Sequence, residues 1–96
     1  MPITGRWTRL GTWAMTALPK TGGVYELANV QYQVIFIGGC ENLDLRLHQH
    51  LYTRDPCLSR AWHFRFEEHL SPAERLRELL DEHRQEHGVL PDCMKG

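Results

Sequence analysis

The sequence lacks three features that would point to a partner or a compartment. Its 96 residues include 11 basic and 12 acidic side chains, a net charge of −1, so no overall basic field indicates nucleic acid or a membrane surface. No apolar run approaches the roughly 20 residues of a membrane helix, and no basic and apolar signal segment begins the sequence. These absences predict a cytoplasmic protein that does not span a membrane.

Cysteine is scarce and is not arranged in motifs. Cys40, Cys57 and Cys93 form no CxxC pair, so neither a disulfide framework nor a structural zinc site is predicted. A reducing setting follows by default. Cys40 directly precedes a predicted helix, where a thiolate is stabilised. A reactive thiol and an inert, partly buried one both fit this position, and the inert one is preferred.

The composition is that of one small domain. Hydrophobic residues make up 42% and charged residues 24%, and a chain of this length buries only about two-thirds of its unfolded surface, so a homodimer is compatible with it. Residues 1–20 are predicted to be a lead-in and residues 21–96 the domain. Trp7 and Trp13 are expected to cover the core, with an exposed binding surface as the alternative.

Three segments have the pattern of strands. Residues 23–27 and 32–37 are closely spaced and predict an antiparallel hairpin. The run from Val34 to Ile37 is apolar on both faces and predicts a central strand covered by helices on each side. Residues 62–67 alternate between aromatic and polar side chains, which indicates a half-buried third strand.

The first predicted helix begins after the glycine pair that ends the hairpin. Asn42 is a suitable N-cap, and leucines form an inward stripe to about residue 51. Arg46 and His50 lie one turn apart at the edge of this stripe, beside Gly38 and Gly39. This arrangement suits a phosphate, although a long basic side chain also reaches solvent from such a place without any function.

The second predicted helix carries its own start and stop signals. It begins with a capping box formed by Ser71 and Glu74 and ends at Gly88. Its apolar face also carries His83 and His87, which are spaced to grip a metal from one helix. No third ligand is evident, so packing is the preferred role of these histidines.

An ordered series of residues resembles the signature of the GIY-YIG nuclease superfamily. The carrying residues are two tripeptides, a helix start, and an arginine eight residues after the second motif's glycine: Gly23, Val24, Tyr25, Phe36, Ile37, Gly38, Asn42, Arg46 and His50. The tail, with FRFEE, a Leu-Leu helix and GVLPDCM, is similar to that of small stand-alone members. The resemblance covers residues 19–94.

The resemblance implies both a fold and an activity. The fold is a small α/β (α+β) domain with a three-stranded antiparallel sheet flanked by helices, the class that the hydrophobic pattern predicts independently. The activity is hydrolysis of a DNA phosphodiester with one divalent ion, Mg²⁺ or Mn²⁺, as Lewis acid. By position, Tyr25 orients the attacking water, Arg46 stabilises phosphate charge and His50 is an accessory polar residue. The substrate is expected to contact Gly38, Gly39 and Asn42.

Three positions depart from the family pattern. Phe36 replaces the second-motif tyrosine and lacks its hydroxyl, and Met94 replaces an asparagine of the tail. Leu76 stands where the resemblance implies the metal-binding glutamate, and leucine cannot bind a hard cation. Glu74 and Glu78 are weak candidates to replace it, because they lie about 160° and 200° around the helix from Leu76. No metal site is therefore predicted.

These departures leave two hypotheses and do not decide whether the protein is an enzyme. The first is a GIY-YIG-type domain that acts on or binds DNA with impaired or lost hydrolysis. The alternative is a non-catalytic module that keeps the fold for protein binding or self-association.

Overall fold

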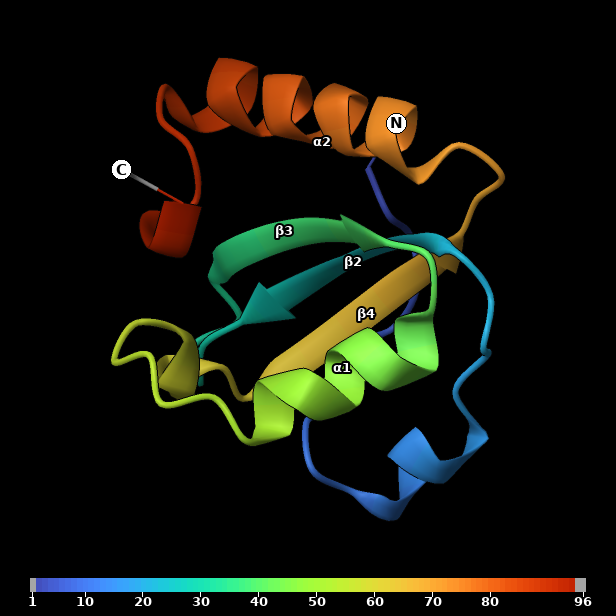
Figure 1. Ribbon diagram of the computed structural model, residues 1–96. Coiled ribbons are helices and arrows are strands. Elements are labelled where there is room, and N and C mark those ends of the chain that lie inside the picture. The colour runs from blue at the N-terminus through green and yellow to red at the C-terminus, as the bar shows by residue number, and fades with distance from the viewer. Residues whose placement is uncertain (1, 95–96) are drawn as a thin grey trace.

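One antiparallel sheet of four strands organises the chain in the computed structural model, which describes residues 2–94 (Figure 1). The sheet has the strand order β1-β4-β2-β3. In chain order the elements are β1 (Thr8–Arg9), η1 (Trp13–Ala17), β2 (Gly23–Ala28), β3 (Val34–Cys40), α1 (Leu43–Leu51), η2 (Leu58–Arg60), β4 (His63–Glu68), α2 (Pro72–His87) and η3 (Asp92–Met94). The predicted α/β (α+β) class is confirmed. The fourth strand is the difference, since β1 comes from the N-terminal segment and pairs with β4.

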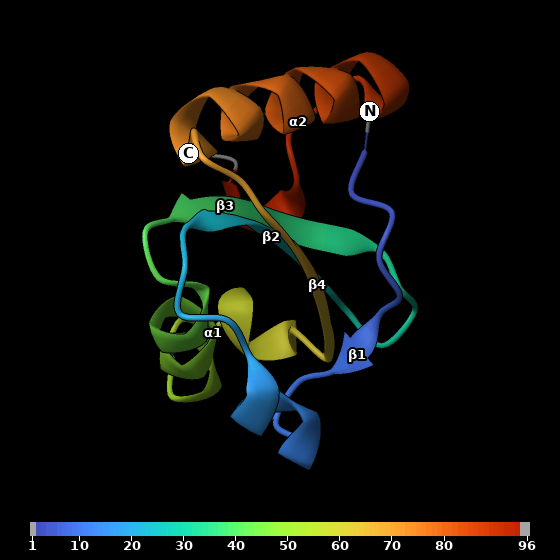
Figure 2. The same cartoon turned by 90° about the vertical axis from the view of Figure 1, so that its right-hand side faces the viewer.

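Helices cover both faces of the sheet, as predicted from the apolar run in the hairpin. Figure 2 shows α2 on one face and α1 with the short 3₁₀ helix η1 on the other. Two apolar clusters fill the two layers. Tyr25, Leu27, Leu43 and Leu47 belong to the cluster under α1, and Leu79 belongs to the cluster under α2.

The prediction that residues 32–37 form the central strand is wrong. β3 begins at Val34 and lies at the edge of the sheet, whereas β2 is an inner strand with all six residues buried. Tyr32 adopts a left-handed φ of 63° in the turn. Gly38 and Gly39 lie within β3 rather than ending it. β3 therefore carries apolar residues on both faces because a helix covers each face of the sheet. It is not flanked by a strand on both sides.

Helix capping follows the sequence at Asn42 and Gly88 but not at Ser71. The Asn42 side chain accepts a hydrogen bond from the Leu45 backbone at 3.1 Å, and Gly88 ends α2 with a φ of 77°. Pro72 occupies the first turn of α2, but the Ser71 side chain makes no cap hydrogen bond, so the predicted capping box does not form. No helix in the described part of the chain is both long and apolar enough to cross a membrane.

The N-terminal segment enters the core through residues other than its tryptophans. Ile3, Met15 and Leu18 are buried, whereas 84% of Trp13 is exposed. Trp7 is half-buried and lies beneath the Arg65 guanidinium, 4.2 Å from its ring centre. The expectation that both tryptophans cover the core is therefore wrong for Trp13.

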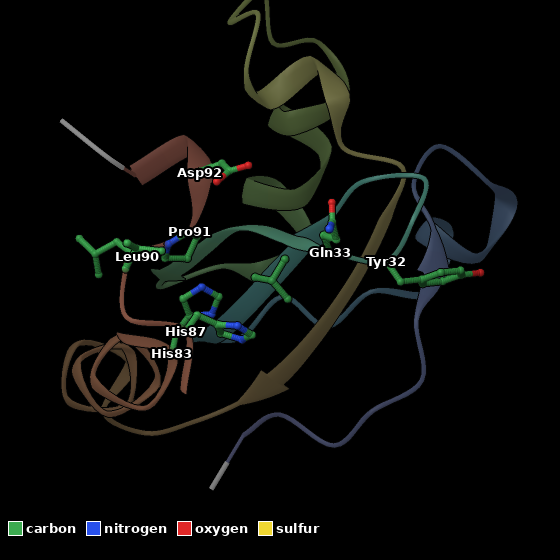
Figure 3. A pocket seen from close by; sticks show the side chains of 9 residues that line it. Tyr32, Gln33, His83, His87, Leu90, Pro91 and Asp92 are labelled. Carbon is green, nitrogen blue, oxygen red and sulfur yellow. The ribbon is translucent and has the colours of Figure 1, made fainter. Parts of the chain in front are cut away.

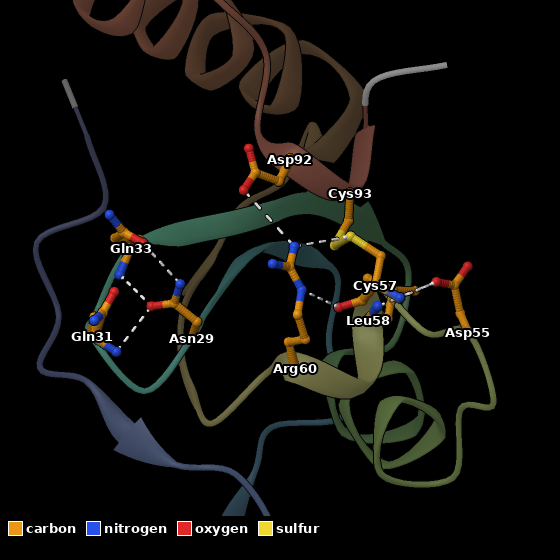
Figure 4. A network of polar contacts seen from close by, with 9 residues as sticks. All are labelled: Asn29, Gln31, Gln33, Asp55, Cys57, Leu58, Arg60, Asp92 and Cys93. Carbon is orange, nitrogen blue, oxygen red and sulfur yellow. Dashed lines mark hydrogen bonds and ion pairs between the residues drawn. A yellow bond between two sulfur atoms is a disulfide. The ribbon is translucent and has the colours of Figure 1, made fainter.

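A disulfide joins Cys57 to Cys93, contrary to the prediction from the cysteine pattern. It ties the loop around η2 to the C-terminal turn η3, which packs against β3 (Figure 4). The Arg60 guanidinium lies beside the bridge, 3.3 Å from Cys57 Sγ and 3.8 Å from an Asp92 oxygen. The pairing depends on two segments, 36 positions apart, that only the fold brings together, so no local motif predicts it.

Candidate functional site

The Tyr25 ring occupies space that a side chain at position 38 would need. It is paired across the sheet with Gly38 and is 1% exposed. A Cβ atom on Gly38 would stand 2.6 Å from both Cζ and Oη of Tyr25, closer than any packed pair of atoms. Because Gly38, the second-motif glycine, has no side chain, the Tyr25 ring can pack against β3.

The structure brings Tyr25 and His50 together. The Tyr25 hydroxyl lies 2.8 Å from Nε2 of His50 on α1. Phe36 packs near both, with its ring centre 6.0 Å from that of Tyr25 and 5.5 Å from that of His50. Phe36 thus keeps the aromatic packing of the cluster, but it offers no hydroxyl to water or phosphate.

Arg46 supplies the positive charge of this cluster. It lies one turn before His50 on α1 and is exposed. Burial raises the pKa of Tyr25 to about 12, and the Arg46 guanidinium opposes the rise through its charge and a hydrogen bond. Burial and then Arg46 lower the pKa of His50. At neutral pH the phenol is therefore protonated and the imidazole neutral, so the hydroxyl can donate to Nε2.

A cleft of about 430 Å³ opens beside this cluster. Its lining includes Cys40, Glu41, Asn42, Leu45, Arg46 and Gln49. Burial raises the pKa of the Cys40 thiol, which agrees with an inert, partly buried cysteine. The Oδ1 atom of Asn42 is engaged in capping α1, so its predicted contact with substrate would come from its Nδ2 amide or its backbone.

The residues on the other side of β3 do not fit a hard divalent ion. A Cβ on Gly39 would lie 3.6 Å from Cβ and Cδ2 of Leu76, and Leu76 packs with the apolar cluster under α2. Glu74 is exposed, and a Glu78 oxygen lies 3.0 Å from an Arg75 nitrogen. Within residues 2–94 no three His, Cys, Asp or Glu side chains form a group able to hold a metal. A magnesium-type site requires carboxylate oxygens that this edge does not provide.

A buried ion pair next to Leu76 escaped prediction. Arg75 is 7% exposed and binds both oxygens of Glu67, at 2.7 and 3.2 Å. Both oxygens of the Glu67 carboxylate are therefore already bound by Arg75. One signal could have revealed it, because Arg75 lies four residues before the buried Leu79 and so shares its helix face.

The fold and this cluster define a class, the GIY-YIG endonuclease fold. The N-terminal GIY-YIG endonuclease domain of UvrC from Thermotoga maritima, a point mutant bound to its catalytic divalent cation, superposes with a TM-score of 0.64 at 18% identity, covering 86% of this chain and 92% of that one. The magnesium-bound domain gives a TM-score of 0.60 at 18% identity over 84% and 91%. The likeness extends over most of both chains and shows a shared fold.

A family model places the sequence in a family. A family model described as a domain of unknown function, DUF7508, matches residues 1–86, so the chain belongs to the DUF7508 family. Comparison with curated proteins gives no match.

Proposed function

We propose that this protein binds DNA through the cluster of Tyr25, Arg46 and His50 and has impaired or lost metal-dependent hydrolysis of the phosphodiester. The observation that carries the proposal is the Tyr25–His50 hydrogen bond beside Arg46. On the other side of β3, Leu76 lies beside Gly39 at the position where the resemblance implies a carboxylate. Support also comes from the fold shared with the GIY-YIG endonuclease domain of UvrC, which binds its catalytic magnesium ion.

Each residue of the cluster would have a distinct task. Arg46 is exposed and permanently charged, so it suits a backbone phosphate. Neutral His50 can accept a hydrogen bond from the one proton of the Tyr25 hydroxyl and hold it in one orientation, so the hydroxyl oxygen can then only accept a hydrogen bond, as from a water beside the phosphate. The Tyr25 ring and Leu76 fill the space beside Gly38 and Gly39, so a contact of these glycines with DNA would come from their backbone groups. Glu74 and Glu78 do not serve as metal ligands in this proposal, and neither Mg²⁺ nor Mn²⁺ is needed for binding.

We expect no Mg²⁺-dependent or Mn²⁺-dependent nicking by the wild-type protein, because the edge at Leu76 lacks a carboxylate for the ion. The assay uses supercoiled plasmid, branched DNA and single-stranded DNA, with the Tyr25→Phe variant as the matched background. Nicking by the wild type that disappears in Tyr25→Phe would show that catalysis survives and would overturn this part of the proposal.

DNA affinity is expected to fall roughly tenfold in Arg46→Ala at low salt, the effect of losing one charge-assisted contact of about 1.5 kcal/mol. The slope of log affinity against log salt should decrease by about one. Fluorescence anisotropy with a labelled duplex measures both quantities. Arg54→Ala is the control, since Arg54 is exposed but does not line the cleft beside Arg46. Equal loss in both variants, or no binding at all, would contradict the proposal.

The second candidate function is a protein-interaction or self-association module, including a homodimer. Exposed apolar side chains favour it, since Trp13 is 84% exposed and Tyr52 81% exposed. Sedimentation of the wild type and of Trp13→Ser over a range of concentrations separates the two candidates. A mass that rises with concentration and returns to the monomer in Trp13→Ser would favour self-association.

A cytoplasmic location remains our proposal, on different grounds from the cysteine pattern. The Cys57–Cys93 bridge removes the premise that the cysteines are unpaired, and structural disulfides are most frequent in oxidising compartments. A DNA partner favours the compartment that contains DNA. Mass spectrometry after alkylation shows whether Cys57 and Cys93 are thiols or a disulfide, and so tests whether the bridge forms in the isolated protein.

A further inference from the structure

The C-terminal half of α2 carries two histidines that the proposed DNA site does not use. The ring centres of His83 and His87 are 4.4 Å apart, with 39° between the ring planes. Both side chains line two neighbouring clefts between α2 and the sheet, one of about 400 Å³ and one of about 260 Å³. Figure 3 shows both rings extending from α2 into the larger cleft. They lie on one helix face because they are four residues apart.

The surroundings of this histidine pair favour a cation over an anion. Glu82 and Glu86 line the smaller cleft with the histidines, and Asp92 lines the larger one. Arg65 also lines the smaller cleft, but its guanidinium lies 2.6 Å from a carboxylate oxygen of Glu26. An incoming cation therefore meets Glu82 and Glu86 on the walls of the smaller cleft. Asp92 lies 3.8 Å from Arg60, and Glu26 compensates the charge of Arg65.

The histidine pair is also accessible to an ion. The side chain of His87 is 54% exposed, so a hydrated ion can reach the pair from solvent.

We propose that His83 and His87 form a two-histidine binding site for a divalent transition metal ion such as Zn²⁺, Ni²⁺ or Cu²⁺. Imidazole is a preferred ligand of these ions, and two histidines at i and i+4 on a helix hold zinc in metalloenzymes. No group of three ligands exists among residues 2–94, so water completes the coordination and the ion remains exchangeable. The site lies on α2, apart from the cluster around Tyr25, and the inference does not depend on the proposed DNA binding.

Calorimetric titration of the untagged full chain with Zn²⁺ and with Ni²⁺ at pH 7.5 tests the site. We expect one ion per chain, and an affinity weakened roughly 10-fold to 100-fold in His87→Gln, the range that loss of a supporting group costs a metal site. His48→Gln is the matched control, because His48 is a half-exposed helical histidine that already contacts Asp44. Mg²⁺ should give no heat, since a hard ion prefers oxygen ligands.

A second measurement distinguishes coordination from a change in folding. In a histidine NMR spectrum, sub-stoichiometric Zn²⁺ should shift or broaden the ring signals of His83 and His87 together and leave that of His48 unchanged. The site is overturned if the wild type binds neither Zn²⁺ nor Ni²⁺, if His87→Gln binds as tightly as the wild type, or if the ring signal of His48 responds first.

Discussion

Replacing the disulfide in the double variant Cys57→Ser/Cys93→Ser is expected to lower the free energy of unfolding by about 4 kcal/mol, as calculated for a closed loop of this length. The bridge spans 36 positions, so it removes much conformational freedom from the unfolded chain. For a domain of this size, about 4 kcal/mol is a large part of the total stability. Urea unfolding followed by circular dichroism measures the difference.

The control for this prediction is Cys40→Ser, which alters the one cysteine outside the bridge. Its effect should be small beside that of the double variant, because the Cys40 side chain is only half-buried. Adding a reducing agent should destabilise the wild type and leave the double variant unchanged. Equal stability of wild type and double variant under oxidising conditions would show that the bridge does not form in solution.

The variant Arg65→Met is expected to lose about 3 kcal/mol at pH 7, the cost of removing one partner of a buried ion pair. The Glu26 side chain is only 7% exposed, and its carboxylate lies 2.6 Å from Nε of Arg65. Methionine keeps much of the stem that packs near Trp7 but leaves the carboxylate without its partner. Chemical denaturation at several pH values measures the loss.

The loss should be smaller at acid pH. Burial raises the pKa of Glu26 above its ordinary value of 4.5, and Arg65 opposes that rise, so the pKa rises further when Arg65 is removed. A raised carboxyl pKa in the folded state contributes stability that is full below the unfolded value and is lost as pH rises through the folded value. The deficit of Arg65→Met relative to wild type should therefore shrink as pH falls from 7 toward 5.

The double variant Glu26→Gln/Arg65→Met is the control for the charge. It removes the buried carboxylate as well as its partner, so it should recover most of the stability at pH 7 and lose the dependence on pH. A deficit in Arg65→Met that stays constant between pH 5 and pH 7 would show that lost packing, not the unpaired charge, causes it.

Phe36 and Leu76 represent two different kinds of departure from the family pattern. Phe36 stays in ring contact with Tyr25 and His50, so the substitution removes a hydroxyl and leaves the packing of the cluster. Leu76 stands where the resemblance implies the metal-binding glutamate, and it joins the apolar cluster under α2. In our proposal the first change weakens the chemistry, and the second removes the place for the metal.

Local features of the fold could be predicted because neighbouring residues determine them. Asn42 caps α1 through a hydrogen bond three residues away, and Gly88 ends α2 because it adopts a left-handed conformation that side chains disfavour. The alternation over residues 62–67 predicted a half-buried strand, and in β4 Phe64 is buried. The resemblance assigned Tyr25 and His50 to one site, and the structure places them in hydrogen-bond contact.

Only the tertiary structure decided the features that join distant positions. Strand order made β3 an edge strand, although its apolar run resembled a central one. The bridge between Cys57 and Cys93 and the pairing of Arg75 with Glu67 depend on segments that meet only after folding. Hydrophobic periodicity tells which side of an element is buried, but it contains no information on which partner lies opposite. By itself, the sequence therefore determined most of the elements, the caps at Asn42 and Gly88 and, through the resemblance, the Tyr25–Arg46–His50 series, while folding determined the partners of its cysteines and buried charges.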